Sequence, residues 1–307
     1  MYLKNKYVVA TRPSLLATVQ TEQTVNLLRE KFPGIEFEIV KFSTHGDNVQ
    51  DKPLTDFGGT GVFVKELEMA IDRGDADFAI HSLKDVPGIV PSQFVIASYP
   101  KREDPRDVIL TNDGKTLDEL KENCIIGTSS PRRLLQISKL KPGAIFKDIR
   151  GNIDTRIKKL NSGEYDAIVL AAAGLKRLGK SIPAQSFLPV DLCLPAIGQG
   201  IIGLECRKDD TGSIEMLRSI NHDVTEIAAK AERMFMFTIG GGCKFPLAAY
   251  AVINNEELTL YSMIGNHKTG DILHKNLKST VDKAEVCGET LANLIKHDSE
   301  KLGISLV

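Results

Sequence analysis

Residues 124–140 read CIIGTSSPRRLLQISKL and join a predicted strand to a predicted helix through a turn of small and polar residues. The apolar run at 124–127 is short and ends at a glycine, as a buried strand does. Over 131–140 the apolar residues Leu134, Ile137 and Leu140 recur three positions apart behind a proline, which predicts a helix. A strand, a turn and a helix in this order indicate an α/β fold.

The same alternation continues on both sides of this unit. It predicts two α/β lobes with a ligand cleft between them, because open sheets bind ligands at the carboxyl ends of their strands. The predicted strands are 7–10, 35–42, 77–82, 108–110, 145–150 and 167–171, and the predicted helices are 14–31 with Ser14 as its cap, 62–73, 117–123 and 155–160.

The pattern changes after residue 203 and predicts a smaller α+β domain. Its expected elements are helices at 214–219 and 224–237, strands at 247–252 and 258–264, and a last helix from about residue 282. We therefore expect a discontinuous first lobe (1–100 with 201–219), a second lobe (101–200) and a C-terminal domain (220–307).

Composition fits a folded protein of two or three domains, with 307 residues, 42% of them hydrophobic and 26% charged. No apolar run reaches the length of a signal-peptide core or a membrane span, so we expect a cytoplasmic protein. Five single cysteines without a CxxC pair, and six histidines without HExxH spacing, predict reduced thiols and no metal.

Charge is unevenly distributed along a chain whose net charge is -1. Residues 101–200 carry 17 Lys and Arg against 12 Asp and Glu. A basic segment in a nearly neutral protein favours an anionic small ligand over nucleic acid.

The turn GTSSPRR (127–133) is suited to binding an anion, because free backbone N–H groups and hydroxyls lie at the positive end of the helix dipole. Arg132 and Arg133 in the first helical turn oppose that dipole unless an anion lies between them. The alternative is an ordinary cap by Ser129 or Ser130 with solvated arginines. Four more arginines stand at strand ends or helix starts, which together suggests a polycarboxylate ligand: Arg12, Arg150, Arg156 and Arg177.

HSLKDVP (81–87) places Lys84 and Asp85 where the strand at 77–82 ends. A carboxylate there can act as a base or stabilise a developing cation, and an ordinary surface turn is the alternative. Cys243 follows three glycines and precedes Lys244, which favours a presented thiolate, whereas a lone cysteine is more often buried filler. The glycine loop at 58–61 lacks the Lys and Ser or Thr of a nucleotide-binding loop, and Phe63 beside it reads as a core residue.

Together these stretches resemble the hydroxymethylbilane synthase (porphobilinogen deaminase) family across about residues 7–250. The matching motifs, in order, are ATR (10–12), FVKELE (63–68), HSLKDVP (81–87), REDPRD (102–107), GTSSPRR (127–133), RGN with TR (150–152 and 155–156), AGLKRLG (173–179), PAIGQG (195–200), AER (231–233) and GGCKFP (241–246).

The resemblance implies two periplasmic-binding-protein-like (type II) lobes and a small C-terminal α+β domain. It implies a dipyrromethane cofactor held on Cys243 through a thioether, with Asp85 as the catalytic carboxylate and no metal. The substrate would be porphobilinogen and the protein a cytoplasmic monomer, with neither nucleic acid nor membrane as a partner. The cofactor-binding residues would be Lys84, Asp85, Thr128, Ser129, Ser130, Arg132, Arg133, Arg150 and Gly151, and the substrate-binding residues Arg12, Ser14, Phe63, Arg150, Arg156, Arg177 and Gln199.

The implied reaction joins four porphobilinogens head to tail. Loss of ammonia leaves an azafulvenium cation, which Asp85 stabilises, and water finally releases the linear tetrapyrrole. The chain departs from common family patterns at His45, Asp56, Thr60 and Gly240, which bears on loop charge and on affinity for late intermediates.

Two other classes of protein also fit the residues alone. A non-catalytic anion-binding protein, either a solute receptor or the effector domain of a regulator, would also carry arginines around a cleft. The lack of a signal-peptide pattern counts against a solute receptor, and the lack of a helix-turn-helix pattern counts against a regulator. A nucleotide-dependent enzyme is a weaker third, because no complete phosphate-loop motif is present.

Overall fold

The computed structural model describes residues 3–43, 61, 64–240, 246–266 and 268–301. Its chain forms two compact units, each built from two separate stretches. Unit 1 comprises Met1–Glu103 and Gly200–Ala229, and unit 2 comprises Asp104–Gln199 and Lys230–Val307. The division into three domains, with the last from residue 220, stays a prediction. None of the described helices is long and apolar enough to span a bilayer.

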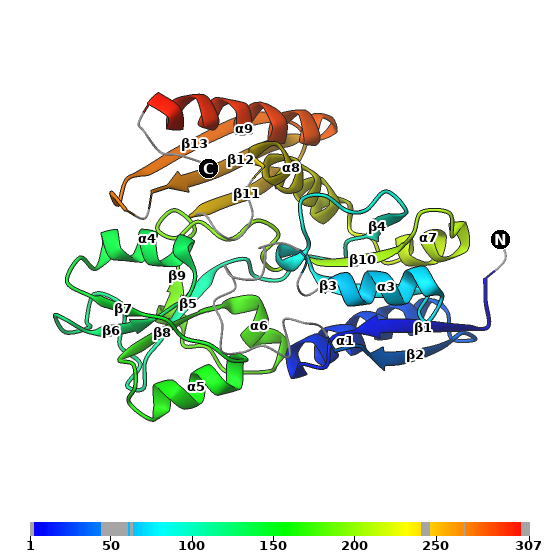
Figure 1. The fold of residues 1–307 in the computed structure, drawn as a ribbon, viewed down its shortest axis with the longest axis horizontal. Coiled ribbons are helices and arrows are strands. Elements are labelled where there is room, and N and C mark those ends of the chain that lie inside the picture. The colour runs from blue at the N-terminus through cyan, green and yellow to red at the C-terminus, as the bar shows by residue number, and fades with distance from the viewer. Residues whose placement is uncertain (1–2, 44–60, 62–63, 241–245, 267, 302–307) are drawn as a thin grey trace. The chain divides into compact units, whose positions relative to one another are not determined.

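Unit 1 contains a five-stranded sheet in which a strand from far along the chain lies between two early ones (Figure 1). The order is β2-β1-β3-β10-β4, and β10 is antiparallel to both of its neighbours. The strands are β1 (Lys6–Thr11), β2 (Glu36–Lys41), β3 (Phe78–Ser82), β4 (Phe94–Ser98) and β10 (Ile202–Arg207).

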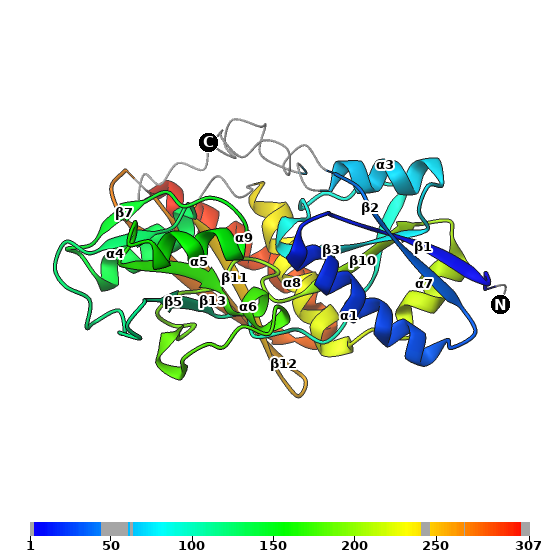
Figure 2. The same ribbon diagram turned by 90° about the horizontal axis from the view of Figure 1, so that it is seen from below.

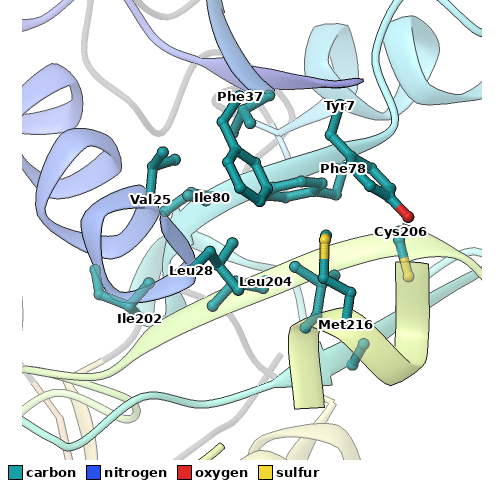
Figure 3. Packing of buried hydrophobic residues seen from close by; sticks show 13 residues of the cluster. Tyr7, Val25, Leu28, Phe37, Phe78, Ile80, Ile202, Leu204, Cys206 and Met216 are labelled. Atoms are coloured by element: carbon teal, nitrogen blue, oxygen red, sulfur yellow. The ribbon is translucent and has the colours of Figure 1, made fainter. Parts of the chain in front are cut away.

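Helices cover both faces of this sheet. Successive residues of β3 point to opposite faces and belong to two different hydrophobic cores. Phe78 and Ile80 belong to one core with α1 (Leu15–Lys31) and α7 (Thr211–Arg218) (Figure 3). Ala79 belongs to the other core, against α3 (Lys65–Arg73). Figure 2 shows α1 and α3 on opposite sides of β1 and β3.

Unit 2 contains a second five-stranded sheet, ordered β7-β6-β8-β5-β9. β6 is parallel to β7 and β8, whereas β5 is antiparallel to β8 and β9. The elements are β5 (Asp107–Leu110), β6 (Ile125–Gly127), α4 (Pro131–Leu140), β7 (Ile145–Lys147), α5 (Ile153–Asn161), β8 (Ala167–Ala171), α6 (Ala172–Arg177) and β9 (Phe187–Leu188). α4 packs on one face through Ile137 and α5 on the other through Leu160.

The rest of unit 2 is a three-stranded antiparallel sheet with helices. Its elements are α8 (Asp223–Ile239), which begins in unit 1, β11 (Leu247–Asn254), β12 (Glu257–Gly265), β13 (Ile272–Thr280) and α9 (Ala284–Lys301). Gly288 permits α9 to approach α8, because an added Cβ would lie 2.4 Å from the Ala231 carbonyl oxygen. The predicted fold class, two α/β sheets with a smaller α+β region, is confirmed.

One predicted element is wrong. Residues 117–123 form turns instead of a helix. Leu117 and Leu120 are both buried, so their spacing of three reflects two anchors in one turn. Asn123 then takes a left-handed backbone with φ +58°, which prevents a helix from continuing.

Candidate functional site

The polar residues of unit 2 gather at one edge of its sheet. β6, β7 and β8 are parallel, so the segments that follow them leave from the same edge. β5 runs the other way, and its first residue, Asp107, pairs with Ala171 at the end of β8. We call this the carboxyl edge of unit 2. It brings together the segments that begin at Thr128, Ile149 and Ala172, and Asp107.

The hydroxyls of the GTSSPRR turn hold the turn itself. Ser130 is the N-cap of α4, where its Oγ accepts a hydrogen bond of 3.4 Å from the Arg133 N–H. Thr128 Oγ1 accepts from the Ser130 N–H at 3.2 Å. Ser129 Oγ donates to the Ile149 carbonyl at 2.9 Å and so ties the turn to the segment after β7. The ordinary cap considered from sequence is therefore present.

Arg132 and Arg133 are both buried against Asp107. Arg132 Nη2 lies 2.7 Å from Asp107 Oδ2, and Arg133 Nη2 lies 2.7 Å from Oδ1. Burial alone would raise the pKa of Asp107, but the charges of Arg132 and Arg133 outweigh it and hold this pKa well below its usual range. The anion required between two arginines at a helix N-terminus is thus supplied by the chain.

Two further side chains complete this buried network. Gln199 is 1% exposed, and its Nε2 donates to Asp107 Oδ1 at 2.9 Å and to the Pro105 carbonyl at 2.6 Å. Cys193 Sγ lies 3.5 Å from Asp107 Oδ2, and burial, followed by the charge of Asp107, raises the pKa of this thiol to about 12. Cys193 therefore stays a neutral thiol.

Arg156 lies in α5, the helix that follows the RGN segment. Arg156 Nε donates to the Gly151 carbonyl at 2.8 Å, and no carboxylate of the described residues forms an ion pair with its guanidinium. Burial, then the charges of Arg133 and Arg150, lower the pKa of Arg156 to about 10. A bound anion would stabilise the charged guanidinium of Arg156.

Local geometry explains why a glycine precedes α5. Gly151 has φ +105°, and a Cβ there would lie 2.6 Å from Thr155 Cγ2. Asn152 then caps α5, where its Oδ1 accepts from the Thr155 N–H at 2.9 Å. Arg177 is the last residue of α6, the helix that follows β8, and is partly buried.

In unit 1 the predicted site residues follow β1 and β3, two parallel neighbours. Ser14 is the N-cap of α1 and accepts from the Ala17 N–H at 3.3 Å. Arg12 is partly buried beside it in sequence. Thr11 is fully buried and fixes the start of this segment, since its hydroxyl is bonded to Thr21 Oγ1 at 2.7 Å.

Lys84 and Asp85 lie in a short 3-10 turn, η2 (Leu83–Asp85), directly after β3. Both are partly buried, and the residues on either side, Leu83 and Val86, are 1% and 2% exposed. The Leu83 N–H also donates to the Ile201 carbonyl at 2.9 Å. Two apolar anchors and one backbone bond therefore hold the turn at the carboxyl end of β3.

His81, at the end of β3, belongs to a group of ionisable side chains with Glu205 and Glu68. His81 Nε2 is 2.9 Å from Glu205 Oε2, and both side chains are buried. Burial, followed by the charge of Glu205, raises the pKa of Glu68 on α3 to about 7, although His81 acts in the opposite direction. His81 therefore forms a buried hydrogen bond with Glu205.

Cys243 and Phe63 lie outside the described residues, as do His45, Asp56 and Thr60. The segment that carries Cys243 is bounded by the end of α8 at Ile239 and the start of β11 at Leu247. The four described cysteines, Cys124, Cys193, Cys206 and Cys287, are buried and unpaired.

Asp107 is the residue of this site that the sequence did not reveal. It is the last residue of the REDPRD motif, but no role was expected for it. Its position 25 or more residues before its arginine partners leaves no local signal. The available clue was the unbalanced arginine pair, which required an anion of unknown origin.

Solved structures resemble the chain only in part. The periplasmic VFT2 domain of Bordetella pertussis BvgS has a TM-score of 0.42 at 17% identity and covers 76% of this chain and 92% of its own. Substrate binding domain 2 of Lactococcus lactis GlnP has a TM-score of 0.42 at 15% identity, with 71% and 89% covered.

Sequence relatives match almost the whole chain. Porphobilinogen deaminase of Brevibacillus brevis is 42% identical over 308 residues, covering 96% of this chain and 99% of the relative. That of Listeria monocytogenes is 39% identical over 303 residues, covering 98% of each. Two family models match, the dipyrromethane cofactor binding domain of porphobilinogen deaminase over residues 7–215 and its C-terminal domain over 226–297. The chain therefore belongs to the porphobilinogen deaminase family.

Proposed function

We propose that the carboxyl edge of unit 2 binds the acidic side chains of pyrroles while Asp85 of unit 1 performs the chemistry. As a member of its family, the chain is a hydroxymethylbilane synthase, a transferase of porphyrin biosynthesis that uses a dipyrromethane cofactor. It joins four porphobilinogen molecules head to tail with loss of ammonia and releases the linear tetrapyrrole by hydrolysis. The observation that carries the proposed site is Arg156, a partly buried cation that is bonded to the Gly151 carbonyl, senses the charges of Arg133 and Arg150, and has no acidic partner among the described residues.

These arginines suit the cofactor and its growing product, because every pyrrole ring adds an acetate and a propionate. Guanidinium groups bind carboxylates in a bidentate manner, and burial strengthens each such bond. The N-terminus of α4 adds the positive end of its dipole at the same edge. We assign carboxylate binding here to Arg133, Arg150, Arg156 and Arg177, with Thr128, Ser129, Ser130, Arg132, Gly151 and Gln199 shaping the edge.

In unit 1 we assign Asp85 to catalysis. Ammonia leaves the substrate as positive charge develops on the pyrrole, and a carboxylate fixed by the anchors Leu83 and Val86 stabilises that charge without having to reorganise. Asp85 also accepts and returns the protons exchanged at the reacting carbons. Lys84, Arg12 and Ser14 offset or bind substrate carboxylates, and we keep Phe63 as a substrate contact.

Cys243 anchors the cofactor through a thioether in this proposal. When bound, the dipyrromethane supplies the first pyrrole carbon to which substrate is joined. The three-domain division expected from sequence belongs to the same proposal, with Cys243 in the third domain. We also propose that the protein is a cytoplasmic monomer and that neither nucleic acid nor a membrane is its partner.

Intact mass of the purified protein tests cofactor attachment. We expect the mass to exceed that of the sequence by a two-pyrrole adduct, and acidic p-dimethylaminobenzaldehyde to colour the protein. Cys243→Ser should lose both signals. A folded, active wild-type protein without an adduct would contradict the assignment.

Asp85→Ala tests the catalytic role. We expect it to lower kcat about a hundredfold or more at retained adduct, because a preorganised charge is lost. Asp113→Ala is the matched control, since Asp113 is an exposed acid paired with Lys115. Wild-type turnover by Asp85→Ala would remove Asp85 from the mechanism.

A further inference from the structure

Asp107 holds two arginines with one carboxylate. Its Oδ1 accepts from Arg133 Nε at 3.1 Å and from Arg133 Nη2 at 2.7 Å, and its Oδ2 lies 2.7 Å from Arg132 Nη2. The side chain is fully buried, and Gln199 adds a bond of 2.9 Å to Oδ1. The carboxylate is therefore fixed, and both guanidinium groups are fixed against it.

The two arginines differ in which N–H groups their bonds occupy. Arg132 also donates through Nη1 to the Leu194 carbonyl at 2.5 Å and contacts Cys193 Sγ at 3.7 Å. Its side chain is 5% exposed. Arg132 thus serves mainly to balance Asp107 and to tie α4 to the Leu194 segment.

Arg133 is held by Asp107 on one side and by the Val169 carbonyl on the other, and some of its N–H groups remain able to donate to a ligand. Its Nη1 donates to the Val169 carbonyl at 3.1 Å, opposite the bonds to Asp107. A guanidinium has five N–H groups, and these bonds use one on each nitrogen of Arg133, which leaves one on each of Nη1 and Nη2. Its charge lowers the pKa of Arg156, which has no acidic partner among the described residues.

We propose that Asp107 is the positioning residue of the carboxyl edge, which fixes the plane of Arg133 so that its remaining N–H groups meet a pyrrole carboxylate together with Arg150 and Arg156. This inference rests on the proposed function of that edge. It assigns Arg132 a structural task and Arg133 the contact with ligand.

Asp107→Asn separates positioning from simple neutralisation by the sign of its effect. If Asp107 merely cancels charge, its removal makes the edge more cationic, and KM for porphobilinogen falls. If Asp107 positions Arg133, KM rises on the order of tenfold while kcat changes little, because one oriented charge-assisted bond to the ligand is lost. Intact mass should also show a smaller fraction of chains with the adduct.

Ile109→Ala is the matched control for stability. Ile109 lies two residues along the same strand and is 1% exposed, so its truncation destabilises β5 without a change of charge. At a comparable loss of thermal midpoint, Ile109→Ala should keep the wild-type KM and adduct. A shared rise in KM would show that unstable β5, and not Arg133, is responsible, and would overturn the proposal.

If Asp107→Asn alone does not fold, Asp107→Asn with Arg132→Gln removes one charge of each sign and leaves no unpaired Arg132. This double variant should fold and still show the raised KM. A wild-type or lower KM in either folded variant overturns the proposal. Wild-type protein that lacks both adduct and turnover would instead contradict the proposed function, before any variant is compared.

Discussion

Gly151 has a backbone conformation, φ +105°, that a side chain would strain. Gly151→Ala would also place its Cβ 2.6 Å from Thr155 Cγ2. We expect the variant to lose about 1–3 kcal/mol of unfolding free energy and to weaken substrate binding, because Arg156 is bonded to the Gly151 carbonyl. Urea titration and KM measure the two effects.

Gly163→Ala is the control, since Gly163 also has a positive φ, +81°, but nothing lies within 4 Å of an added Cβ. It should show only the backbone cost, about 1 kcal/mol, with KM unchanged. Equal effects of the two substitutions on KM would contradict a special role for Gly151.

In our proposal, Arg156 binds substrate carboxylates, but its charge does not stabilise the fold of the cofactor-free protein. We expect Arg156→Gln to lose no unfolding free energy in cofactor-free protein, because burial and two neighbouring cations already disfavour this charge. KM for porphobilinogen should rise about tenfold. Thermal melting and steady-state kinetics test the pair of effects, and a destabilised variant with normal KM would make Arg156 structural.

At the scale of single residues, local sequence patterns predicted where a residue lies in a helix or strand better than they predicted which side chain it pairs with. The GTSSPRR pattern offered Ser129 or Ser130 as a helix cap, and Ser130 is the N-cap of α4. It also required an anion near Arg132 and Arg133, but the chain's own Asp107 supplies one from a distant segment. Only the folded sheet, which pairs Asp107 with Ala171, brings them together.

At the scale of elements, the contact between α3 and the sheet of unit 1 includes ionisable side chains: Glu68 on α3 lies near Glu205 on β10 and His81 on β3. Glu68 on α3 has a pKa raised to about 7 by burial and by Glu205. Between its ordinary value of 4.5 and about 7, the folded protein therefore binds more protons at Glu68 than the unfolded chain does. The stability that Glu68 contributes is full below this window and is lost as pH rises through it.

Glu68→Gln should remove this loss. Relative to wild type, we expect the variant to gain unfolding free energy as pH rises from about 5 to about 8, by on the order of 1 kcal/mol, because Glu68 is only half-buried. Denaturant titrations at several pH values measure this difference. Glu285→Gln, at an exposed position of α9, is the control and should show no such trend. A Glu68→Gln difference that is constant with pH would contradict the expectation.

Several elements with a clear apolar period were predicted, whereas some strands, among them β4, β10 and β13, were missed. The helix at 131–140 and the strand at 167–171 match α4 and β8. β10 was missed because Gly203 and the buried Glu205 interrupt its apolar run, and Glu205 is tolerated there only because His81 pairs with it. β13 was missed because its exposed face carries His274, Asn276, Lys278 and Thr280, and its other face carries Lys275 and Ser279 among the apolar residues.

At the scale of the whole molecule, the arginines of the carboxyl edge make folding and cofactor attachment interdependent. Cys243→Ser leaves Arg133, Arg150 and Arg156 without the cofactor's carboxylates, so we expect a lower thermal midpoint than in wild type. Inorganic phosphate should raise the midpoint of Cys243→Ser more than that of wild type. Potassium chloride at equal ionic strength is the control, and equal phosphate shifts in the two proteins would contradict the expectation.

The resemblance in motif order predicted the family from sequence, because each motif is short and specific and all stand in one order along the chain. The α/β class followed from alternating patterns. The order of strands did not, because no local pattern shows that β10, from beyond residue 200, lies between β3 and β4.

That position of β10 also sets an order of events at the ribosome. β3 and β4 do not pair with each other; each pairs with β10, so the sheet begun by the first hundred residues stays open until residue 207 has been made. The second sheet needs only residues 107–188 and becomes complete while the first still waits. We therefore expect nascent chains to complete the second sheet before the first, the reverse of the usual order of synthesis and folding, with the facing edges of β3 and β4 unpaired in the meantime.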